Sequence, residues 1–198
     1  MILKLASIFF TMILVDNYVL SKFLGICPFL GVSKKFDSAV GMSLAVTFVM
    51  VMATAATWPI YTLILEPNGM AYLQTIVFIL VIAILVQLLE NFLKKFIPSL
   101  YAALGVYLPL ITTNCAILGV TILNIDNGYN FIESIVCAAG AGIGFLLAMV
   151  LFSGVRRKVE AAKPPKCFEG LPITLVAAAM TSMSFMGFGG IVSAIFGV

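Results

Sequence analysis

Long apolar runs alternate with short polar segments along the whole chain, and each run is long enough to cross a membrane as a helix. A hydrocarbon core about 30 Å thick requires about 20 consecutive apolar residues per helix. The pattern predicts an all-α polytopic membrane protein with one membrane domain, residues 1–198. The six expected spans cover about 5–26, 39–65, 72–92, 100–123, 131–153 and 171–195.

The first run is expected to be a retained span. It carries Asp16 and Lys22 and is followed by no clear small-residue cleavage site, unlike a removed signal peptide.

Basic residues follow every second span, and this asymmetry predicts the orientation. The loops after spans 1, 3 and 5 carry Lys34, Lys35, Lys94, Lys95, Arg156, Arg157, Lys158, Lys163 and Lys166. The alternate loops, 66–71 and 124–130, contain no Lys or Arg, and only Lys4 argues the other way. Because basic loops stay in the cytoplasm, we expect both termini to lie outside it.

Composition narrows the chemistry. The chain is 63% hydrophobic and 10% charged, so there is no room for a soluble catalytic domain, and we expect lipid rather than nucleic acid around it. It contains no histidine, which excludes a bis-His haem, a His-rich zinc site and an imidazole base. The cysteines remain as candidate ligands: Cys27, Cys115, Cys137 and Cys167.

Two cysteine phrases repeat. "CPFLGV" at 27–32 matches "CAILGV" at 115–120, and "FDSAV" before span 2 is followed in the same order by "IESIV" at the start of span 5. Residues 1–92 and 98–198 therefore read as two copies of one unit. Since three spans are an odd number, the second copy enters from the opposite side, which predicts a 3+3 inverted repeat.

Spans 1 and 4 are expected to be broken near the cysteines. Gly25 and Pro28 bracket Cys27, and Pro109 and Asn114 precede Cys115. Cys27 lies about 10 Å before Lys34, and Cys115 about 13 Å before Asn124, if the chain is helical. Half of the hydrocarbon core is about 15 Å, so both cysteines should lie near mid-depth.

The two mid-depth cysteines allow three interpretations. A lone membrane cysteine is usually a small buried hydrophobe, and this is expected of Cys137 and Cys167. A disulfide between Cys27 and Cys115 would leave the helix breaks unexplained. A [2Fe–2S] cluster uses four cysteines, so two would have to come from a second chain, with the cluster at the interface.

Four motifs of the chain are distinctive: "KFLGICPFLGVSKK" (22–35), "YLPLITTNCAILGV" (107–120), "VQLLE" (86–90) and "FMGFGG" (185–190). With these motifs, the chain resembles the A subunit of the Rnf ion-translocating oxidoreductase complexes over essentially its whole length. The equivalent subunit of the sodium-pumping NADH:quinone reductase has similar motifs and is the alternative within this resemblance.

The resemblance implies a membrane subunit that couples electron transfer between ferredoxin and NAD to translocation of Na⁺ or H⁺. It implies an intramembrane [2Fe–2S] cluster with Cys27 and Cys115 as iron ligands, completed by the homologous E subunit. It also implies the B, C, D and G subunits as partners. The chain lacks nucleotide, flavin-attachment and CxxC motifs, so it should be a non-autonomous subunit with no activity alone.

Polar residues at depth suggest an ion route through Asp16, Thr112 and Asn114. Asp16 is either a cation station or a buried partner of Lys22. Glu90 is a weaker candidate, since an i,i+4 pair with Lys94 is the favoured explanation. The rival class is an inverted-repeat secondary transporter, in which the Thr-Asn-Cys phrase binds a solute or sodium.

Overall fold

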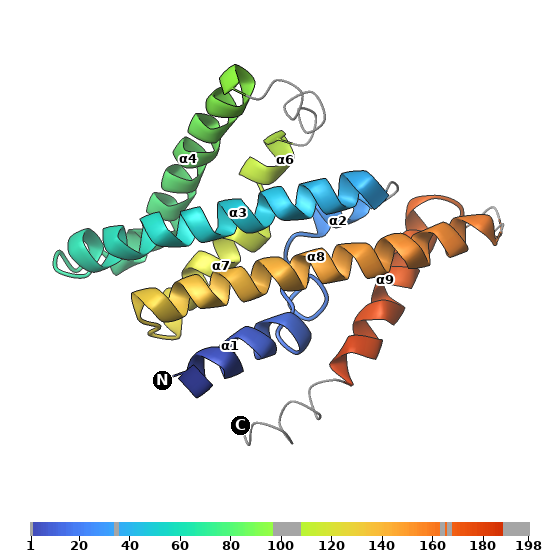
Figure 1. Cartoon of the computed structure of the whole chain (residues 1–198), viewed down its shortest axis with the longest axis horizontal. Helices are drawn as coiled ribbons and strands as arrows, with labels where there is room; N and C mark the ends of the chain where they lie inside the picture. Colours follow the sequence, from blue (N-terminus) through green and yellow to red (C-terminus); the bar gives the residue numbers. More distant parts are fainter. Residues whose placement is uncertain (1, 34–35, 97–107, 163–164, 166–167, 188–198) are drawn as a thin grey trace.

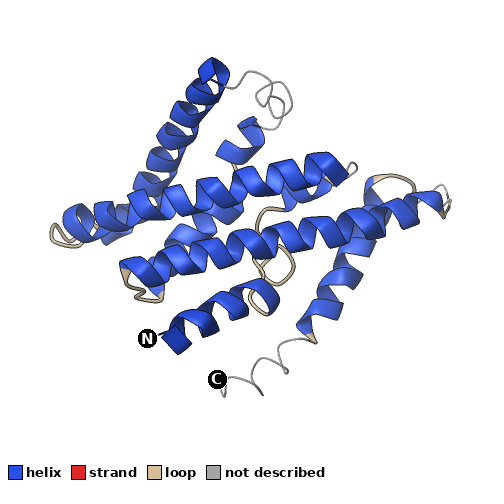
Figure 2. Ribbon diagram, viewed as in Figure 1, coloured by secondary structure: helices blue, strands red, loops and turns tan. Residues whose placement is uncertain are grey.

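The computed structural model describes residues 2–33, 36–96, 108–162, 165 and 168–187, and the regular structure within these ranges is helical (Figure 1, Figure 2). The helices are α1 (Ile2–Leu14), α2 (Ile26–Val32), α3 (Phe36–Ile60), α4 (Gln74–Phe96), α6 (Leu108–Thr112), α7 (Cys115–Asp126), α8 (Phe131–Ala161) and α9 (Leu171–Met186). A π-helical turn, Tyr61–Leu65, extends α3, and a 3₁₀ turn, Ala71–Leu73, leads into α4.

The helices α3 and α8 form the centre of the bundle and run antiparallel, side by side (Figure 1). Thr47 lies opposite Gly142, and Trp58 meets Phe131 edge to face with ring centroids 5.4 Å apart. The helix α1 packs on the other side of α8. The core residues of the chain are therefore gathered around these two long helices.

Three helical segments of the described chain are long and apolar enough to cross a membrane: Ser38–Leu65, Ala71–Phe92 and Phe131–Val159. Shorter apolar helices cover Leu3–Leu14, Leu110–Asp126 and Leu171–Met186. This confirms a helical chain with several apolar spans. Parts of the predicted spans 4 and 6, residues 100–107 and 188–195, lie outside the described residues, so the count of six and the placement of the termini stay predictions.

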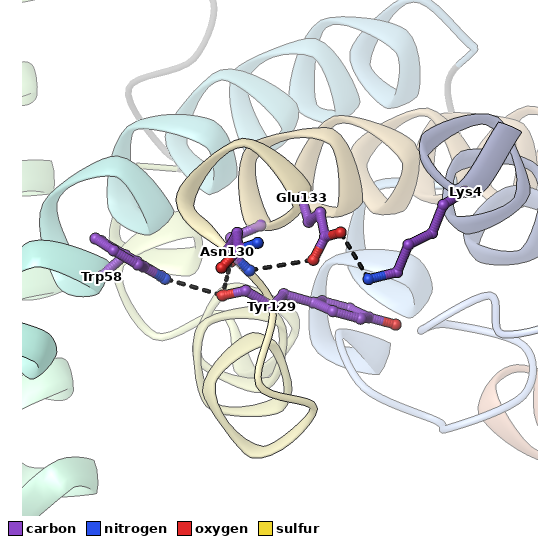
Figure 3. Close-up of polar contacts among 6 residues, drawn as sticks. Lys4, Trp58, Tyr129, Asn130 and Glu133 are labelled. Atoms are coloured by element: carbon purple, nitrogen blue, oxygen red, sulfur yellow. Dashed lines mark hydrogen bonds and ion pairs between the residues drawn. The ribbon is translucent and has the colours of Figure 1, made fainter. Parts of the chain in front are cut away.

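Polar contacts fasten one end of the bundle, where the start of α1 meets the turn before α8 (Figure 3). The Lys4 ammonium lies 2.7 Å from Oε1 of Glu133, and Glu133 forms a capping box with Asn130. The indole N–H of Trp58 donates to the Tyr129 carbonyl at 3.0 Å. Glu133 thus has a structural role at this end of the bundle.

The close approach of α3 and α8 depends on Gly142. A Cβ at this position would lie 2.8 Å from Cβ of Thr47. The Thr47 hydroxyl already donates a hydrogen bond to the Ser43 carbonyl. Thr47 is β-branched and stiff, so it has little freedom to move aside. Gly154, on the same helix, has no such neighbour within 4 Å.

We predict that Gly142→Ala lowers the stability of the folded protein by about 1–3 kcal/mol, because the added methyl overpacks the helix contact. Gly154→Ala should be neutral or slightly stabilising, since alanine favours a helix by up to about 1 kcal/mol. Thermal unfolding of the detergent-solubilised protein compares the two. Equal melting temperatures would contradict the predicted contact.

Candidate cofactor site at the helix breaks

The first helix break covers residues 15–25, between α1 and α2, and Asn17 organises it. The Asn17 Oδ1 accepts the backbone N–H groups of Val19 at 3.1 Å and Leu20 at 3.4 Å, and its Nδ2 donates to the Gly144 carbonyl at 2.8 Å. The hydroxyl of Ser182, on α9, donates to the Leu20 carbonyl. Non-helical backbone at membrane depth requires such partners, and here α8 and α9 supply them.

The predicted break in span 1 is confirmed, but its predicted cause is wrong. Pro28 does not interrupt a helix: it is the third residue of α2, after the N-cap Gly25. Backbone N–H groups in the first turn of a helix have no intrahelical acceptor, so a proline, which lacks this group, costs little stability there. The chain instead turns before Cys27, with Phe23 at φ +55° and Gly25 at φ +85°.

The second break is short and lies between α6 and α7, where Asn114 is the N-cap of α7. Its backbone is extended, with φ −73° and ψ 111°, and its Oδ1 accepts the N–H of Ala116 at 3.0 Å. Asparagine is among the favoured N-cap residues for this reason. The predicted interruption ahead of Cys115 is therefore confirmed at Asn114.

The two breaks pack against each other. A Cβ on Gly25 would lie 3.1 Å from both Oδ1 of Asn114 and Cβ of Ala116. Leu24 covers Gly119 of α7, where an added Cβ would overlap its Cδ1. The helix α2 also contacts α6. Gly25 is required here twice, by its positive φ and by the lack of space for a side chain.

This packing places the two predicted ligands in one region of the molecule. Cys27 is the second residue of α2 and Cys115 the first residue of α7, and both side chains are exposed. Cys137 is fully buried, as expected of a packing residue. Cys167 lies outside the described residues. Among the cysteines that the structure describes, the accessible thiols are thus the two that stand at the helix breaks.

A cavity of about 290 Å³ adjoins Cys115, between α4 and the second break. Thr112, Thr113 and Asn114 line it together with Cys115, and α4 adds an apolar wall that includes Ile79 and Ile82. Asn114 is 4% exposed, and its Nδ2 has no hydrogen-bond partner among the described residues. Two of the expected ion-route residues, Thr112 and Asn114, therefore lie in the same cavity.

Asp16 lies just after the end of α1, and its Oδ1 is 3.8 Å from the ammonium of Lys22. The Lys22 ammonium also lies 5.5 Å from the ring centroid of Tyr18. The expected pairing of Asp16 with Lys22 is therefore observed, but the expected burial is wrong, because the two side chains are 39% and 34% exposed. A role in ion movement stays a prediction.

Glu90 lies in the last third of α4. It accepts a hydrogen bond of 3.5 Å from Gln87. The ion pair with Lys94 stays a prediction.

Arg156 contacts the helix that carries Cys27, and the prediction made from its local sequence is wrong. We expected it in a cytoplasmic loop, but it lies within α8 and is only 6% exposed. Its guanidinium donates to the Leu30 carbonyl and, at 2.7 Å, to the hydroxyl of Ser33. Arg156 therefore ties the carboxyl end of α2, the helix of Cys27, to α8. Nothing in the run Arg156-Arg157-Lys158 singles out the first residue.

A set of two exposed thiols is an incomplete metal site. The described residues contain no group of three or more His, Cys, Asp or Glu side chains that could hold a metal ion. A metal centre built on Cys27 and Cys115 would need ligands beyond those that the described residues bring together, and the exposure of both sulfurs leaves them accessible to such ligands. These features define a helical membrane protein with two exposed cysteines at its helix breaks.

Comparison with known proteins gives the family. The model of the Rnf-Nqr subunit membrane proteins matches residues 5–192. The chain is 57% identical to the A subunit of the Na⁺-translocating ferredoxin:NAD⁺ oxidoreductase complex of Acetobacterium woodii, over 95% of this chain and 98% of that protein. It is 53% identical to the A subunit of the ion-translocating oxidoreductase complex of Syntrophotalea carbinolica and to that of Serratia proteamaculans, each over 91% of this chain and 93% of the relative. The chain belongs to the Rnf-Nqr family, and the predicted resemblance is confirmed.

Proposed function

We propose that this chain is the A subunit of an ion-translocating ferredoxin:NAD oxidoreductase of the Rnf type, in a prokaryotic cytoplasmic membrane. The support is the identity of 50% or more, over most of both chains, to relatives named as the A subunit of such complexes. In the complex it contributes membrane residues only, and ferredoxin, NAD and flavin chemistry belong to the partner B, C, D and G subunits.

We further propose that Cys27 and Cys115 are two of the four ligands of a [2Fe–2S] cluster shared with a homologous E subunit. The observation that carries this is the packing of two helix breaks, each presenting one exposed cysteine. A cluster of this type needs four thiolates, and Cys27 and Cys115 would supply two of them. When bound, the cluster would accept and release one electron at a time.

The inverted repeat gives a reason for the shared site. The helices α3 and α8, which stand at corresponding places in the two halves, run antiparallel, and both halves contain a break before a cysteine. Two homologous subunits inserted in opposite orientations would face each other through these breaks. The orientation with both termini outside the cytoplasm remains part of the proposal.

Iron and acid-labile sulfide analysis of the purified complex tests the function. After the iron and sulfide of the other subunits are subtracted, or those subunits are removed, we expect two irons and two sulfides per pair of A and E subunits. A colourless, iron-free protein that takes up a solute would instead support the secondary transporter. A redox-active pair without labile sulfide would refute the cluster.

Asp16 provides a test of the ion route, since its carboxylate can bind a cation or merely neutralise Lys22. If Asp16 is a cation station, Asp16→Asn should raise the Na⁺ or H⁺ concentration needed for half-maximal transport by about tenfold or more, with the cluster retained. Lys22→Met removes the same ion pair and serves as the matched variant. Equal transport defects in both would reduce Asp16 to a structural partner.

A further inference from the structure

The side-chain amide of Asn114 uses only one of its two ends within the described part of the chain. Its Oδ1 accepts the Ala116 N–H at 3.0 Å and lies beside Gly25. Because only an oxygen can cap the helix in this way, the capping bond fixes which end of the amide is the nitrogen. That nitrogen, Nδ2, is buried and has no hydrogen-bond partner among the described residues.

An unpartnered buried amide is costly. Leaving such a donor unsatisfied destabilises the folded protein, and Asn114 is only 4% exposed. A serine or threonine would cap α7 about equally well without burying this second polar group. The extra N–H₂ therefore needs an explanation outside the helix cap.

The surroundings of Asn114 point to a ligand at Cys115. The two residues are adjacent in the chain and line the same cavity of about 290 Å³. An N–H group cannot bind a cation, so its complement is an acceptor atom, such as an oxygen, an anion or sulfur. Thiolate and inorganic sulfur of iron–sulfur clusters accept such bonds, and hydrogen bonds to these sulfurs help to set the reduction potential.

Resting on the proposed function, we propose that Nδ2 of Asn114 donates a hydrogen bond to a sulfur of the cluster held by Cys115 and thereby raises its reduction potential. Asn114 is a positioning residue with two roles: the oxygen starts the helix that carries the ligand, and the nitrogen stabilises the more negative, reduced cluster. The N-cap before Cys27 is Gly25, which has no side chain. Within this chain, the donor acts from the Cys115 side.

The first test compares variants that keep the helix cap and lose the amide. Asn114→Ser and Asn114→Asp both retain an N-cap oxygen, and aspartate also adds a negative charge. In the purified complex we expect the ratio of reduced to oxidised cluster, at a fixed ambient potential, to fall about tenfold or more in Asn114→Asp. This corresponds to about 59 mV for a one-electron couple, with Asn114→Ser between wild type and Asp. Asn124→Ser, which removes an equally buried amide near the other end of α7, is the control and should leave the ratio unchanged.

The second test needs no substitution for its main readout. Wild-type complex containing asparagine labelled with ¹⁵N in the side-chain amide should show a ¹⁵N hyperfine coupling in pulsed EPR of the reduced cluster, and Asn114→Ser should lose it. An iron-loaded wild-type complex without this coupling would overturn the hydrogen bond while leaving the shared cluster intact. A wild-type complex without iron and sulfide would overturn the proposed function itself, and this inference with it.

Discussion

Replacing Cys27 or Cys115 by serine is expected to remove the [2Fe–2S] cluster from the complex and to abolish the coupled ferredoxin–NAD activity. Each substitution takes away one of four thiolates, and the described part of the chain has no third acidic, histidine or cysteine side chain grouped with them as a replacement. Serine is nearly isosteric, and both side chains are exposed, so the helices should still form. The measurements are iron and sulfide content, the EPR signal of the reduced complex, and activity.

Cys137→Ala is the matched control for the cysteine variants. This thiol is fully buried. Truncating a small buried side chain should cost about 1 kcal/mol of stability and leave the cluster signal in place. Retention of iron, signal and activity in both Cys27→Ser and Cys115→Ser would refute the ligand assignment.

Replacing Arg156 by methionine is expected to release α2 and to reduce cluster content by about half or more. The variant leaves the Leu30 carbonyl and the Ser33 hydroxyl without the donor that now joins them to α8. Each unsatisfied buried group costs about 1–3 kcal/mol, and the loss falls on the seven-residue helix that carries Cys27. A helix this short is held by its tertiary contacts rather than by its own propensity.

Two further variants separate this role of Arg156 from its charge. Arg157→Met removes the same charge from the neighbouring exposed position and should leave cluster content unchanged. Arg156→Lys keeps the charge, but its side chain is shorter and lacks the Nη1 group that donates to both acceptors, so it should restore cluster content only in part. Iron per complex and the apparent melting temperature report both effects. An Arg156→Met complex with full iron content and unchanged melting temperature would show that α2 is held by other contacts.

The sequence determined the class of the protein and its two candidate ligands. Apolar runs of about 20 residues can be stable in lipid only as helices, so the helical membrane fold follows from the order of apolar and polar residues alone. The repeated cysteine phrases identified Cys27 and Cys115 because a repeat pairs equivalent positions without knowledge of the fold. Asn114 was predicted as a helix interruption, since its side chain favours the N-cap over the helix interior.

The tertiary structure decided where the first break lies and what holds the site together. Pro28 suggested a helix break next to Cys27, but the energetic cost of a proline depends on its position within the helix. The position of Pro28 in α2 is set by how residues 15–25 pack on α8 and α9. The local sequence around Arg156 is typical of a polar loop, so it does not predict burial. Arg156 is buried against α2 because α8 extends to Ala161. Gly25 and Asn114 come from the two halves of the chain and lie in contact in the folded protein. Local conformational propensities, which act between neighbours along the chain, cannot predict such a contact.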